Sequence, residues 1–270
     1  MACQRCDDRG FYYDRNVLPG LVGKLSLCTC VEQSCRCGSL APYQYFDEAG
    51  EFHWCPCRKH RLGMHSTERL LARANVPKKY QWRFLDDFRE KGPDNRAIKD
   101  AKRLKGYIGS LLDCLKNGQR SRGYVFWGEP GNGKTMLACI ALNELILWSG
   151  KPGLYIDLSF EYFQRLRSTY NEESEMHGRA AEIIEELSSV PFLVIDDFGV
   201  QRNTEWEKEM LYNLVDRRYA DERLTFITTN KSIDEVRQLS DGRIYSRLVE
   251  MCHVVHVTAP DYRLKYEKAL

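Results

Sequence analysis

The stretch GYVFWGEPGNGKT, residues 123–135, decides the fold. Its first five residues are typical of a short buried strand, and the mainly apolar stretch that follows, up to Trp148, is long enough for a helix. The loop between them has the spacing G-x-x-x-x-G-K-[ST] in the strand-to-helix setting that this motif requires. Its residues are Gly128, Glu129, Pro130, Gly131, Asn132, Gly133, Lys134 and Thr135. Because glycines let backbone N–H groups converge on anionic oxygens at a helix start, the sequence predicts a phosphate-binding loop.

Two loop residues and one further strand predict how a nucleoside triphosphate and its metal bind. Lys134 is expected to reach the β- and γ-phosphates, and the Thr135 hydroxyl is expected to coordinate magnesium. Residues 192–196, FLVID, form a second buried-strand pattern, and Asp196 lies at its carboxyl end, where ligand sites form in open α/β sheets. We therefore expect Asp196 to bind magnesium together with Thr135, with ATP as the nucleotide.

Two more polar residues at strand ends are candidates for a hydrolytic step. Asp197 is expected to project toward the γ-phosphate and to orient or activate the attacking water, unless it only supports Asp196. Residues 224–230 form another buried-strand pattern that ends in Asn230, whose amide both donates and accepts hydrogen bonds. Asn230 is therefore a candidate for holding that water, with an ordinary turn residue as the alternative.

Five strand patterns alternate with helical patterns along the chain. They cover residues 123–127, 154–158, 192–196, 224–229 and 252–257. Thr204-x-x-Glu207 and Ser232-x-x-Glu235 have the spacing of capping boxes that open the flanking helices. This alternation predicts an α/β fold, with a parallel sheet between helices, over residues 95–270.

Eight of the 11 cysteines lie within the first 57 residues, in four closely spaced pairs. The pairs are Cys3/Cys6, Cys28/Cys30, Cys35/Cys37 and Cys55/Cys57. Structural zinc takes four thiolates at tetrahedral corners, so four pairs supply two complete sites without an open position for catalysis. Since we see no export signal, we expect metal binding in a reducing compartment rather than disulfides. The sequence predicts two zinc ions that fold a small module at residues 1–62.

The ligand pairing of the zinc module has alternatives. Spacing favours Cys3/Cys6 with Cys28/Cys30, and Cys35/Cys37 with Cys55/Cys57, but an interleaved arrangement fits equally. His53 or His60 in place of one cysteine, iron–sulfur ligation, and free thiols in a poorly ordered arm are the other interpretations.

Composition and the lengths of the apolar runs exclude a disordered chain, a fibrous chain and a membrane-spanning protein. Hydrophobic residues at 43% and charged residues at 29% are ordinary for a folded globular chain. No apolar run approaches the roughly 20 residues of a membrane span, so we expect a cytoplasmic protein without a membrane partner. Residues 76–127 hold 13 basic and 6 acidic side chains, a net +7, whereas residues 128–270 hold 17 and 24, a net −7. Two four-thiolate zinc sites would bring residues 1–75 from +2 to about −2, which favours a protein partner over phosphate for that module.

The motifs together resemble one family. The loop at 128–135, the strand at 192–197, Thr228-Thr229-Asn230 and the segment 242–248, preceded by the approach segment 74–80, are similar to AAA+ ATPases of the DnaC/DnaI helicase-loader group, which includes the insertion-sequence ATPase IstB. The resemblance covers roughly residues 70–260. It implies a P-loop AAA+ domain with a five-stranded parallel sheet of order 5-1-4-3-2. Only about 20 residues follow Leu248, too few for the helical lid domain of many AAA+ proteins, so we expect no lid, in agreement with this group.

The resemblance also implies site roles. Segment 242–248 corresponds to the one that carries an arginine finger, so Arg247, with Arg243 as the alternative, is expected to reach the γ-phosphate of a neighbouring subunit. Hydrolysis would then depend on a homo-oligomer that forms with ATP bound. An ordinary surface arginine is the other interpretation of Arg247. Asp197 stands where many AAA+ proteins have glutamate, so turnover is expected to be slow and stimulated by a partner or DNA.

The function implied by the resemblance is that of an ATP-dependent helicase loader. It would bind a replicative DnaB-type hexameric helicase through the cysteine module, place it on single-stranded DNA and release it on hydrolysis. Residues 63–94 would be a linker and the approach segment. The candidates for contact with single-stranded DNA are aromatic side chains, on which bases can stack, and arginines, which attract phosphates. On an amphipathic helix, such residues are also typical of the buried protein core and its edge. The candidates are Phe163, Arg165, Arg167 and Tyr170.

Two other functions remain compatible with these motifs. One is an IstB-like ATPase regulator of DNA transposition, which would share nearly all of the nucleotide residues. The other is a zinc-stapled binding adaptor that uses ATP only as a structural switch.

Overall fold

The computed structural model describes residues 3–15, 23–88, 95–172, 174–199 and 204–261, except the side chains of residues 96, 159, 160, 240 and 241. The chain divides into two compact units, Met1–Ala72 and Arg73–Leu270. Among the described residues, no helix combines the length and the apolar character that a bilayer crossing requires.

The first unit is built from two small antiparallel hairpins and two helices. Strand β1 (Phe11–Asp14) pairs with β2 (Lys24–Leu27), and β3 (Gln44–Phe46) pairs with β4 (Phe52–Trp54). Helix α1 spans Thr29–Glu32 and α2 spans Arg58–Arg73. Helix α2 runs without a break through the predicted module boundary at residue 62, so the start of the predicted linker belongs to this helix.

The second unit contains a parallel five-stranded sheet. Its strands are β5 (Gly123–Trp127), β6 (Gly153–Asp157), β7 (Phe192–Asp196), β8 (Leu224–Thr229) and β9 (Cys252–His256), in the spatial order β6-β7-β8-β5-β9. If only these strands are numbered, from 1 for β5 to 5 for β9, the order read from the β9 edge is 5-1-4-3-2. The order in β labels uses higher numbers than the predicted one because the labels β1–β4 belong to the strands of the first unit. The predicted α/β fold with a parallel sheet is confirmed.

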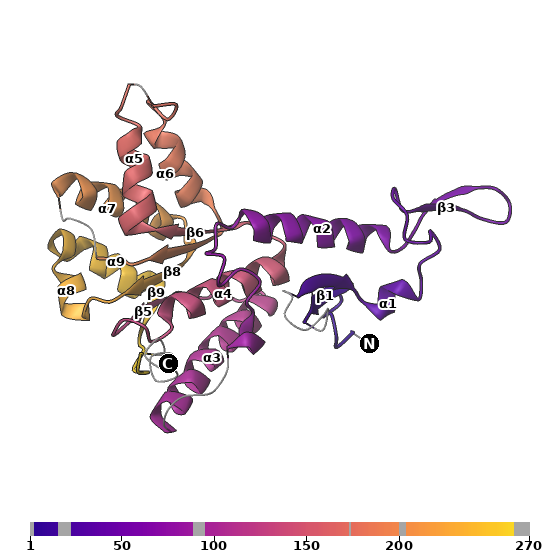
Figure 1. Ribbon diagram of the computed structural model, residues 1–270, viewed down its shortest axis with the longest axis horizontal. Helices are drawn as coiled ribbons and strands as arrows, with labels where there is room; N and C mark the ends of the chain where they lie inside the picture. The colour runs from indigo at the N-terminus through magenta and orange to yellow at the C-terminus, as the bar shows by residue number, and fades with distance from the viewer. Residues whose placement is uncertain (1–2, 16–22, 89–94, 173, 200–203, 262–270) are drawn as a thin grey trace, which may run out of the picture. The chain divides into compact units, whose positions relative to one another are not determined.

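Helices cover both faces of this sheet (Figure 1). Helix α4 (Lys134–Ser149), with α3 (Asn95–Lys116) packed against it, covers one face. Helices α6 (Ala180–Ser189), α7 (Glu205–Ala220) and α9 (Arg243–Met251) share one apolar core on the other. The shorter elements are η1 (Leu85–Asp87), the π-helical turn η2 (Leu158–Tyr162), α5 (Phe163–Ser168), α8 (Ile233–Arg237) and η3 (Leu239–Gly242). No lid follows β9 within the described residues, which end at Asp261.

Residues 74–88 lie within the predicted linker and approach segment, but the structure makes them part of the second unit. The Ala74 carbonyl oxygen accepts a hydrogen bond from the Tyr155 N–H at 2.8 Å, at the β6 edge of the sheet. Asn143 on α4 donates to the Tyr80 carbonyl at 3.1 Å, and the Phe84 side chain is buried. The second unit therefore begins about 20 residues before residue 95, where the sequence placed the start of the AAA+ domain. The sequence of residues 74–88 has no regular hydrophobic period, so it did not predict this packing.

The two predicted capping boxes differ. Ser232 and Glu235 form the full reciprocal pair, with N–H to side-chain distances of 3.3 and 2.8 Å. The Thr204 hydroxyl caps α7 by accepting from the Glu207 N–H at 3.2 Å, but the Glu207 side chain is buried and pairs with Arg167 instead. The prediction for Thr204 and Glu207 is therefore only half correct. The charged Arg167, 40 residues away in sequence, is a stronger partner for the Glu207 carboxylate than a backbone N–H.

Candidate functional site

The loop at residues 128–135 joins the end of β5 to the start of α4, as predicted. Gly133 has a φ of 93° at the N-cap of α4, and Gly128 has a φ of 142°, where an added Cβ would lie 2.4 Å from the Val257 carbonyl oxygen. Both positions therefore require glycine. The loop leads into the N-terminus of a 16-residue helix, where backbone N–H groups and the helix dipole attract anions.

The Lys134 ammonium is buried and folded back onto the loop. It donates to the carbonyl oxygens of Gly128 at 2.8 Å and Glu129 at 2.7 Å, and to Asn132 Oδ1 at 3.1 Å. The Asn132 amide in turn donates to the Val257 carbonyl at 2.7 Å, which ties the loop to the end of β9. These three acceptors of Lys134 carry no net charge, so phosphate oxygens would be stronger partners for the ammonium.

Asp196, at the end of β7, lies in a ring of hydroxyl donors. Thr135 Oγ1 donates to Asp196 Oδ1 at 3.0 Å, Tyr155 Oη donates to Oδ2 at 2.6 Å, and Thr228 Oγ1 also donates to Oδ1. Burial, together with the negative charge of Asp196, raises the pKa of Tyr155, so its hydroxyl keeps its proton and donates. Thr135 and Asp196 are thus in contact, and hydroxyl and carboxylate oxygens are ligands that fit magnesium.

Asp197 and Asn230 lie next to this pair. Asp197 has a φ of 54°, a left-handed conformation that is sparsely populated outside glycine and concentrates at functional sites. Its N–H donates to Thr228 Oγ1 at 3.3 Å, and Asn230 Nδ2 makes a long hydrogen bond of 3.4 Å to Asp197 Oδ1. The two residues predicted for the hydrolytic step are therefore neighbours at the carboxyl edge of the sheet.

A cavity of about 980 Å³ opens over these side chains. This volume is large enough for a nucleotide, since ligand cavities commonly measure about 300–1,000 Å³. Besides the predicted residues, Tyr155 and Asp157 from β6 line it, as do residues of the approach segment and η1. These are Pro77, Lys79 and Tyr80 of the approach segment, Asp87 of η1, and Phe88, which directly follows η1. Sequence reasoning missed these residues as part of the site, although the approach segment was one of the features that carried the family resemblance.

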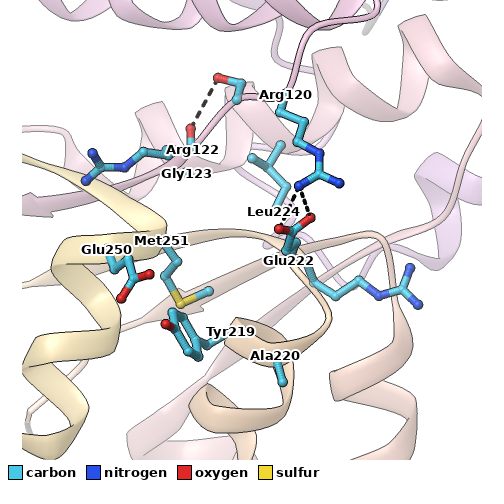
Figure 2. A pocket seen from close by; sticks show the side chains of 11 residues that line it. Arg120, Arg122, Gly123, Tyr219, Ala220, Glu222, Leu224, Glu250 and Met251 are labelled. Atoms are coloured by element: carbon cyan, nitrogen blue, oxygen red, sulfur yellow. Dashed lines mark hydrogen bonds and ion pairs between the residues drawn. The ribbon is translucent and has the colours of Figure 1, made fainter.

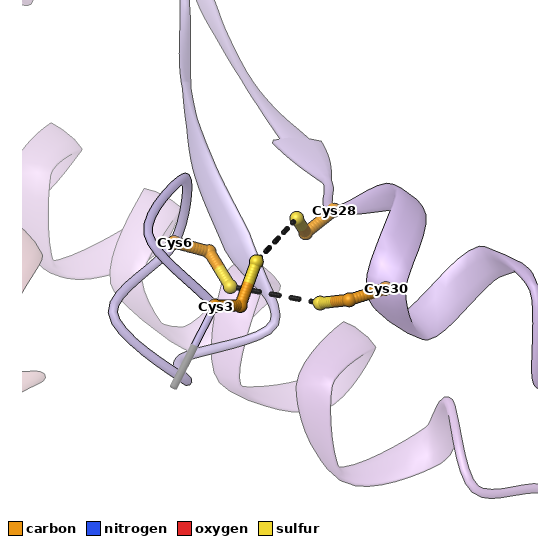
Figure 3. Close-up of side chains that lie close together, drawn as sticks. All are labelled: Cys3, Cys6, Cys28 and Cys30. Atoms are coloured by element: carbon orange, nitrogen blue, oxygen red, sulfur yellow. Dashed lines mark hydrogen bonds between the residues drawn. The ribbon is translucent and has the colours of Figure 1, made fainter. Parts of the chain in front are cut away.

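The eight N-terminal cysteines form two separate groups of four. One group is Cys3, Cys6, Cys28 and Cys30 (Figure 3), and the other is Cys35, Cys37, Cys55 and Cys57. Within each group all four sulfur atoms lie within 4.8 Å of one another. The shortest separations are 3.6–3.7 Å, for example 3.7 Å between Cys3 and Cys28 and 3.6 Å between Cys37 and Cys57. Four sulfurs about 2.3 Å from a zinc ion would be about 3.8 Å apart, so both groups fit tetrahedral zinc.

The structure argues against two alternatives for the metal ligands, an interleaved pairing of the cysteines and a histidine in place of a cysteine. The grouping is the non-interleaved one, and the histidines are engaged elsewhere, because the His53 ring contacts Asp47 at 2.7 Å and the His60 ring contacts the Arg9 carbonyl at 2.7 Å. Hydrogen bonds from backbone N–H groups, that of Arg5 first, lower the pKa of the Cys3 thiol to about 7. This shift favours the thiolate form of Cys3 alone, because the hydrogen bond with Cys28, together with burial, raises the pKa of Cys30 to about 12.

The sequence profile of the family described as IstB-like ATP binding protein matches residues 64–269. This match covers the whole nucleotide site and most of the chain. The chain belongs to the family of IstB-like ATP binding proteins.

Among the curated relatives of this IstB-like chain is the replicative helicase loader DnaC of Escherichia coli, which is 33% identical over 125 residues. That match covers 46% of this chain and 49% of DnaC, so the chain spans only about half the length of that relative. The phage-like element PBSX protein XkdC of Bacillus subtilis is 25% identical over 223 residues, which are 78% of this chain and 77% of XkdC.

Solved structures share the fold. The crystal structure of the DnaC helicase loader superimposes with a TM-score of 0.57 at 24% identity, over 67% of this chain and 100% of that one. The crystal structure of DnaI gives a TM-score of 0.54 at 19% identity, over 72% of this chain and 98% of that one. At these identities the similarity shows the AAA+ architecture alone.

The two predicted finger arginines of the IstB-like domain lie on α9. Within the described residues, neither lines the nucleotide cavity of its own subunit. The Arg243 side chain is exposed and its guanidinium lies 5.3 Å from the centre of the Tyr212 ring. The Arg247 side chain is half-buried and pairs with Asp216 on α7.

The residues predicted to contact single-stranded DNA are mostly engaged inside the IstB-like domain. Phe163 is buried in the core, Arg165 pairs with Glu186 at 3.2 Å, and Arg167 pairs with the buried Glu207. Tyr170 is 62% exposed. Phe163 was therefore a wrong candidate, because its ring packs in the apolar core shared by η2, α5 and α7.

A second cavity, of about 400 Å³, lies at the amino ends of β5 and β8 of the IstB-like domain, where Gly123 and Leu224 line it (Figure 2). Arg120 pairs with Glu222 at 2.7 Å, Arg122 donates to the Cys252 carbonyl at 2.6 Å, and the lining contains no residue of the 128–135 loop. We therefore assign the functional site to the larger cavity at the opposite edge of the sheet.

Proposed function

We propose that this protein is an ATPase that binds a replicative hexameric helicase and places it on single-stranded DNA, with hydrolysis across subunit interfaces driving release. The single observation that carries the nucleotide part is the contact of Thr135 with Asp196, at 3.0 Å, beside the buried Lys134 ammonium. Lys134 would move from the loop carbonyls to the β- and γ-phosphates, and Thr135 and Asp196 would hold the magnesium ion.

The hydrolytic step is assigned to the neighbouring pair. Asp197 would orient or activate the attacking water, and Asn230 would hold that water against Asp197. An arginine of the adjacent subunit, Arg247 or Arg243, would neutralise charge that develops on the γ-phosphate. This arrangement makes turnover depend on assembly, since the transition-state charge is neutralised only between subunits.

The helicase role is supported by the match to loaders named DnaC and by the surface of the first unit. Large apolar side chains are exposed in that unit, and exposed apolar patches mark protein-binding sites. They are Leu40, Phe46, Phe52, Trp54 and Leu62. The rings of Phe46, Phe52 and Trp54 pack edge to face along the β3–β4 hairpin.

The same hairpin is a poor surface for nucleic acid. The Arg58 guanidinium lies 4.2 Å from the centre of the Trp54 ring and covers one of its faces, which a base would need for stacking. With eight zinc-bound thiolates, residues 1–75 would also carry a net charge near −2, which disfavours phosphate. These features favour an apolar protein surface as the partner of the hairpin.

The test is binding of the cognate replicative helicase to the full chain by surface plasmon resonance, with ATP and magnesium. Phe52→Ser is expected to weaken binding by about 30-fold or more, as for a central interface aromatic. Tyr170→Ser, which changes an exposed aromatic of the second unit, serves as the control and should leave affinity unchanged. Absence of helicase binding by the unaltered protein would rule out the loader function.

The family match also favours a second candidate, an IstB-like regulator of DNA transposition. That function predicts ATP-dependent coating of duplex DNA and stimulation of a transposase. Tight duplex binding without helicase binding would support it over the loader.

A further inference from the structure

Tyr155 links an edge of the sheet to the carboxylate at the centre of the nucleotide site. Its hydroxyl donates to Asp196 Oδ2 at 2.6 Å, and its side chain is only 6% exposed. Its backbone is fixed on the other side of the strand: the N–H donates to the Ala74 carbonyl at 2.8 Å, and the carbonyl accepts from Asn75 Nδ2 at 3.1 Å. The approach segment therefore sets the place of the hydroxyl relative to Asp196.

The three hydroxyls around Asp196 divide between its two oxygens. Thr135 and Thr228 donate to Oδ1, whereas Tyr155 donates to Oδ2. When the Thr135 oxygen coordinates magnesium, the positions of Thr228 and Tyr155 still hold one oxygen each. The plane of the carboxylate is thereby fixed from both ends.

Magnesium makes this fixation relevant because it demands near-ideal octahedral geometry at about 2.0–2.1 Å and keeps several waters. A carboxylate that rotates freely presents its lone pairs to the ion or its waters only part of the time. Hydrogen-bond partners that orient a metal-binding group typically account for about 10- to 100-fold in metal affinity.

We propose that Tyr155 is a positioning residue for the magnesium half of the site and acts through Asp196. Its hydroxyl holds Oδ2 so that the remaining lone pairs of Asp196 point toward the ion and its waters. This role rests on the proposed function, because it requires a magnesium–nucleotide complex on the 128–135 loop. A purely structural role for the hydroxyl would instead change stability and leave the metal dependence of nucleotide binding unaltered.

The test compares Tyr155→Phe with Tyr162→Phe in the full chain. Tyr162 is the matched control, because its hydroxyl is also buried but donates to the Met210 carbonyl at 3.2 Å, outside the cavity lining. Binding of a fluorescent ATP analogue is measured over a magnesium titration and again in EDTA, with thermal melting as the folding check. With manganese in place of magnesium, the electron paramagnetic resonance line shape reports the metal environment directly.

Tyr155→Phe is expected to raise the magnesium concentration for half-maximal effect by about tenfold or more, to alter the manganese signal, and to leave metal-free binding unchanged. Tyr162→Phe should match the unaltered protein in all three. An unchanged metal dependence in a folded Tyr155→Phe protein would overturn the positioning role while leaving the proposed function intact. If the unaltered protein binds no nucleotide, the proposed function fails and the role of Tyr155 fails with it.

A second substitution covers the case in which Tyr155→Phe does not fold. A tyrosine that carries fluorine beside its hydroxyl, installed at position 155, changes the donor strength and keeps the hydroxyl. It should also shift the magnesium dependence, and an unchanged dependence would contradict the positioning role.

Discussion

The guanidinium of Arg247 is paired with the carboxylate of Asp216 on α7 of the same subunit. Arg247 Nη2 also donates to Tyr212 Oη at 2.7 Å, and Nη1 donates to the Arg243 carbonyl at 3.2 Å. The hydrogen bond to Asp216 raises the pKa of Arg247, so the side chain keeps its charge at any physiological pH. These contacts orient the arginine within its own chain.

The first prediction concerns this arginine. Arg247→Ala is expected to leave ATP affinity unchanged and to lower turnover of the assembled protein by about 1,000-fold, the usual effect of losing an arginine finger. Steady-state phosphate release measures the rate of ATP turnover. Arg237→Ala, which removes a surface arginine paired with Asp234 at 3.2 Å on α8, is the control. Normal turnover in Arg247→Ala, with a loss in Arg243→Ala, would transfer the role to Arg243.

The second prediction concerns metal content. Two groups of four cysteines predict about two zinc ions per purified chain by mass spectrometry of the metal, and about one in either Cys30→Ser or Cys57→Ser. Because the nucleotide site lies wholly in the second unit, these variants should keep their ATP affinity. A chain that carries iron in place of zinc, or one ion with all eight cysteines intact, would contradict the two-site account.

The third prediction concerns a buried arginine that supports the sheet. Arg218 is fully buried and donates to the carbonyls of Leu187, Val190 and Leu224 at 2.7–2.8 Å, which joins the end of α6 to the start of β8. Arg218→Met leaves these acceptors unpaired and should lower the free energy of unfolding by at least about 3 kcal/mol in urea titrations.

The neighbouring Arg217 provides the matched control for that measurement. Its exposed ion pair with Glu185, at 3.3 Å, should contribute less than about 1 kcal/mol, so Arg217→Met should unfold like the unaltered protein. Equal losses in the two variants would show that burial of Arg218 does not set its contribution.

The nucleotide loop and the strand carrying Asp196 were predictable because each depends on a local pattern. Gly128 to Thr135 have a fixed spacing between a strand and a helix, and the side chain that ends a buried parallel strand must lie at the carboxyl edge of the sheet. The approach of Thr135 to Asp196 follows from these two rules. The grouping of the cysteines was likewise one of the two arrangements that spacing allowed.

The residues that the sequence did not reveal depend on contacts between distant segments. Tyr155 has the pattern of an ordinary strand residue, and its bond to Asp196 appears only when β6 pairs with β7. From the sequence, Arg167 was a candidate cation for DNA contact, but the structure pairs it with the buried Glu207 on another helix. Residues 74–88 lack a period of 2 or 3.6, so their packing on α4 had no local signal.

The central claim is that ATP with magnesium binds on the loop at Lys134, and equilibrium calorimetry with the unaltered protein and Lys134→Ala tests it most directly. Lys134 donates hydrogen bonds to the carbonyl oxygens of Gly128 and Glu129 and to Asn132 Oδ1, and thermal melting of Lys134→Ala checks that the variant folds. Micromolar or tighter binding that weakens at least about 100-fold in Lys134→Ala is the expected result, because the ammonium is the main charged partner of the phosphates. Equal affinity in the two proteins, or no binding by either, would contradict the account.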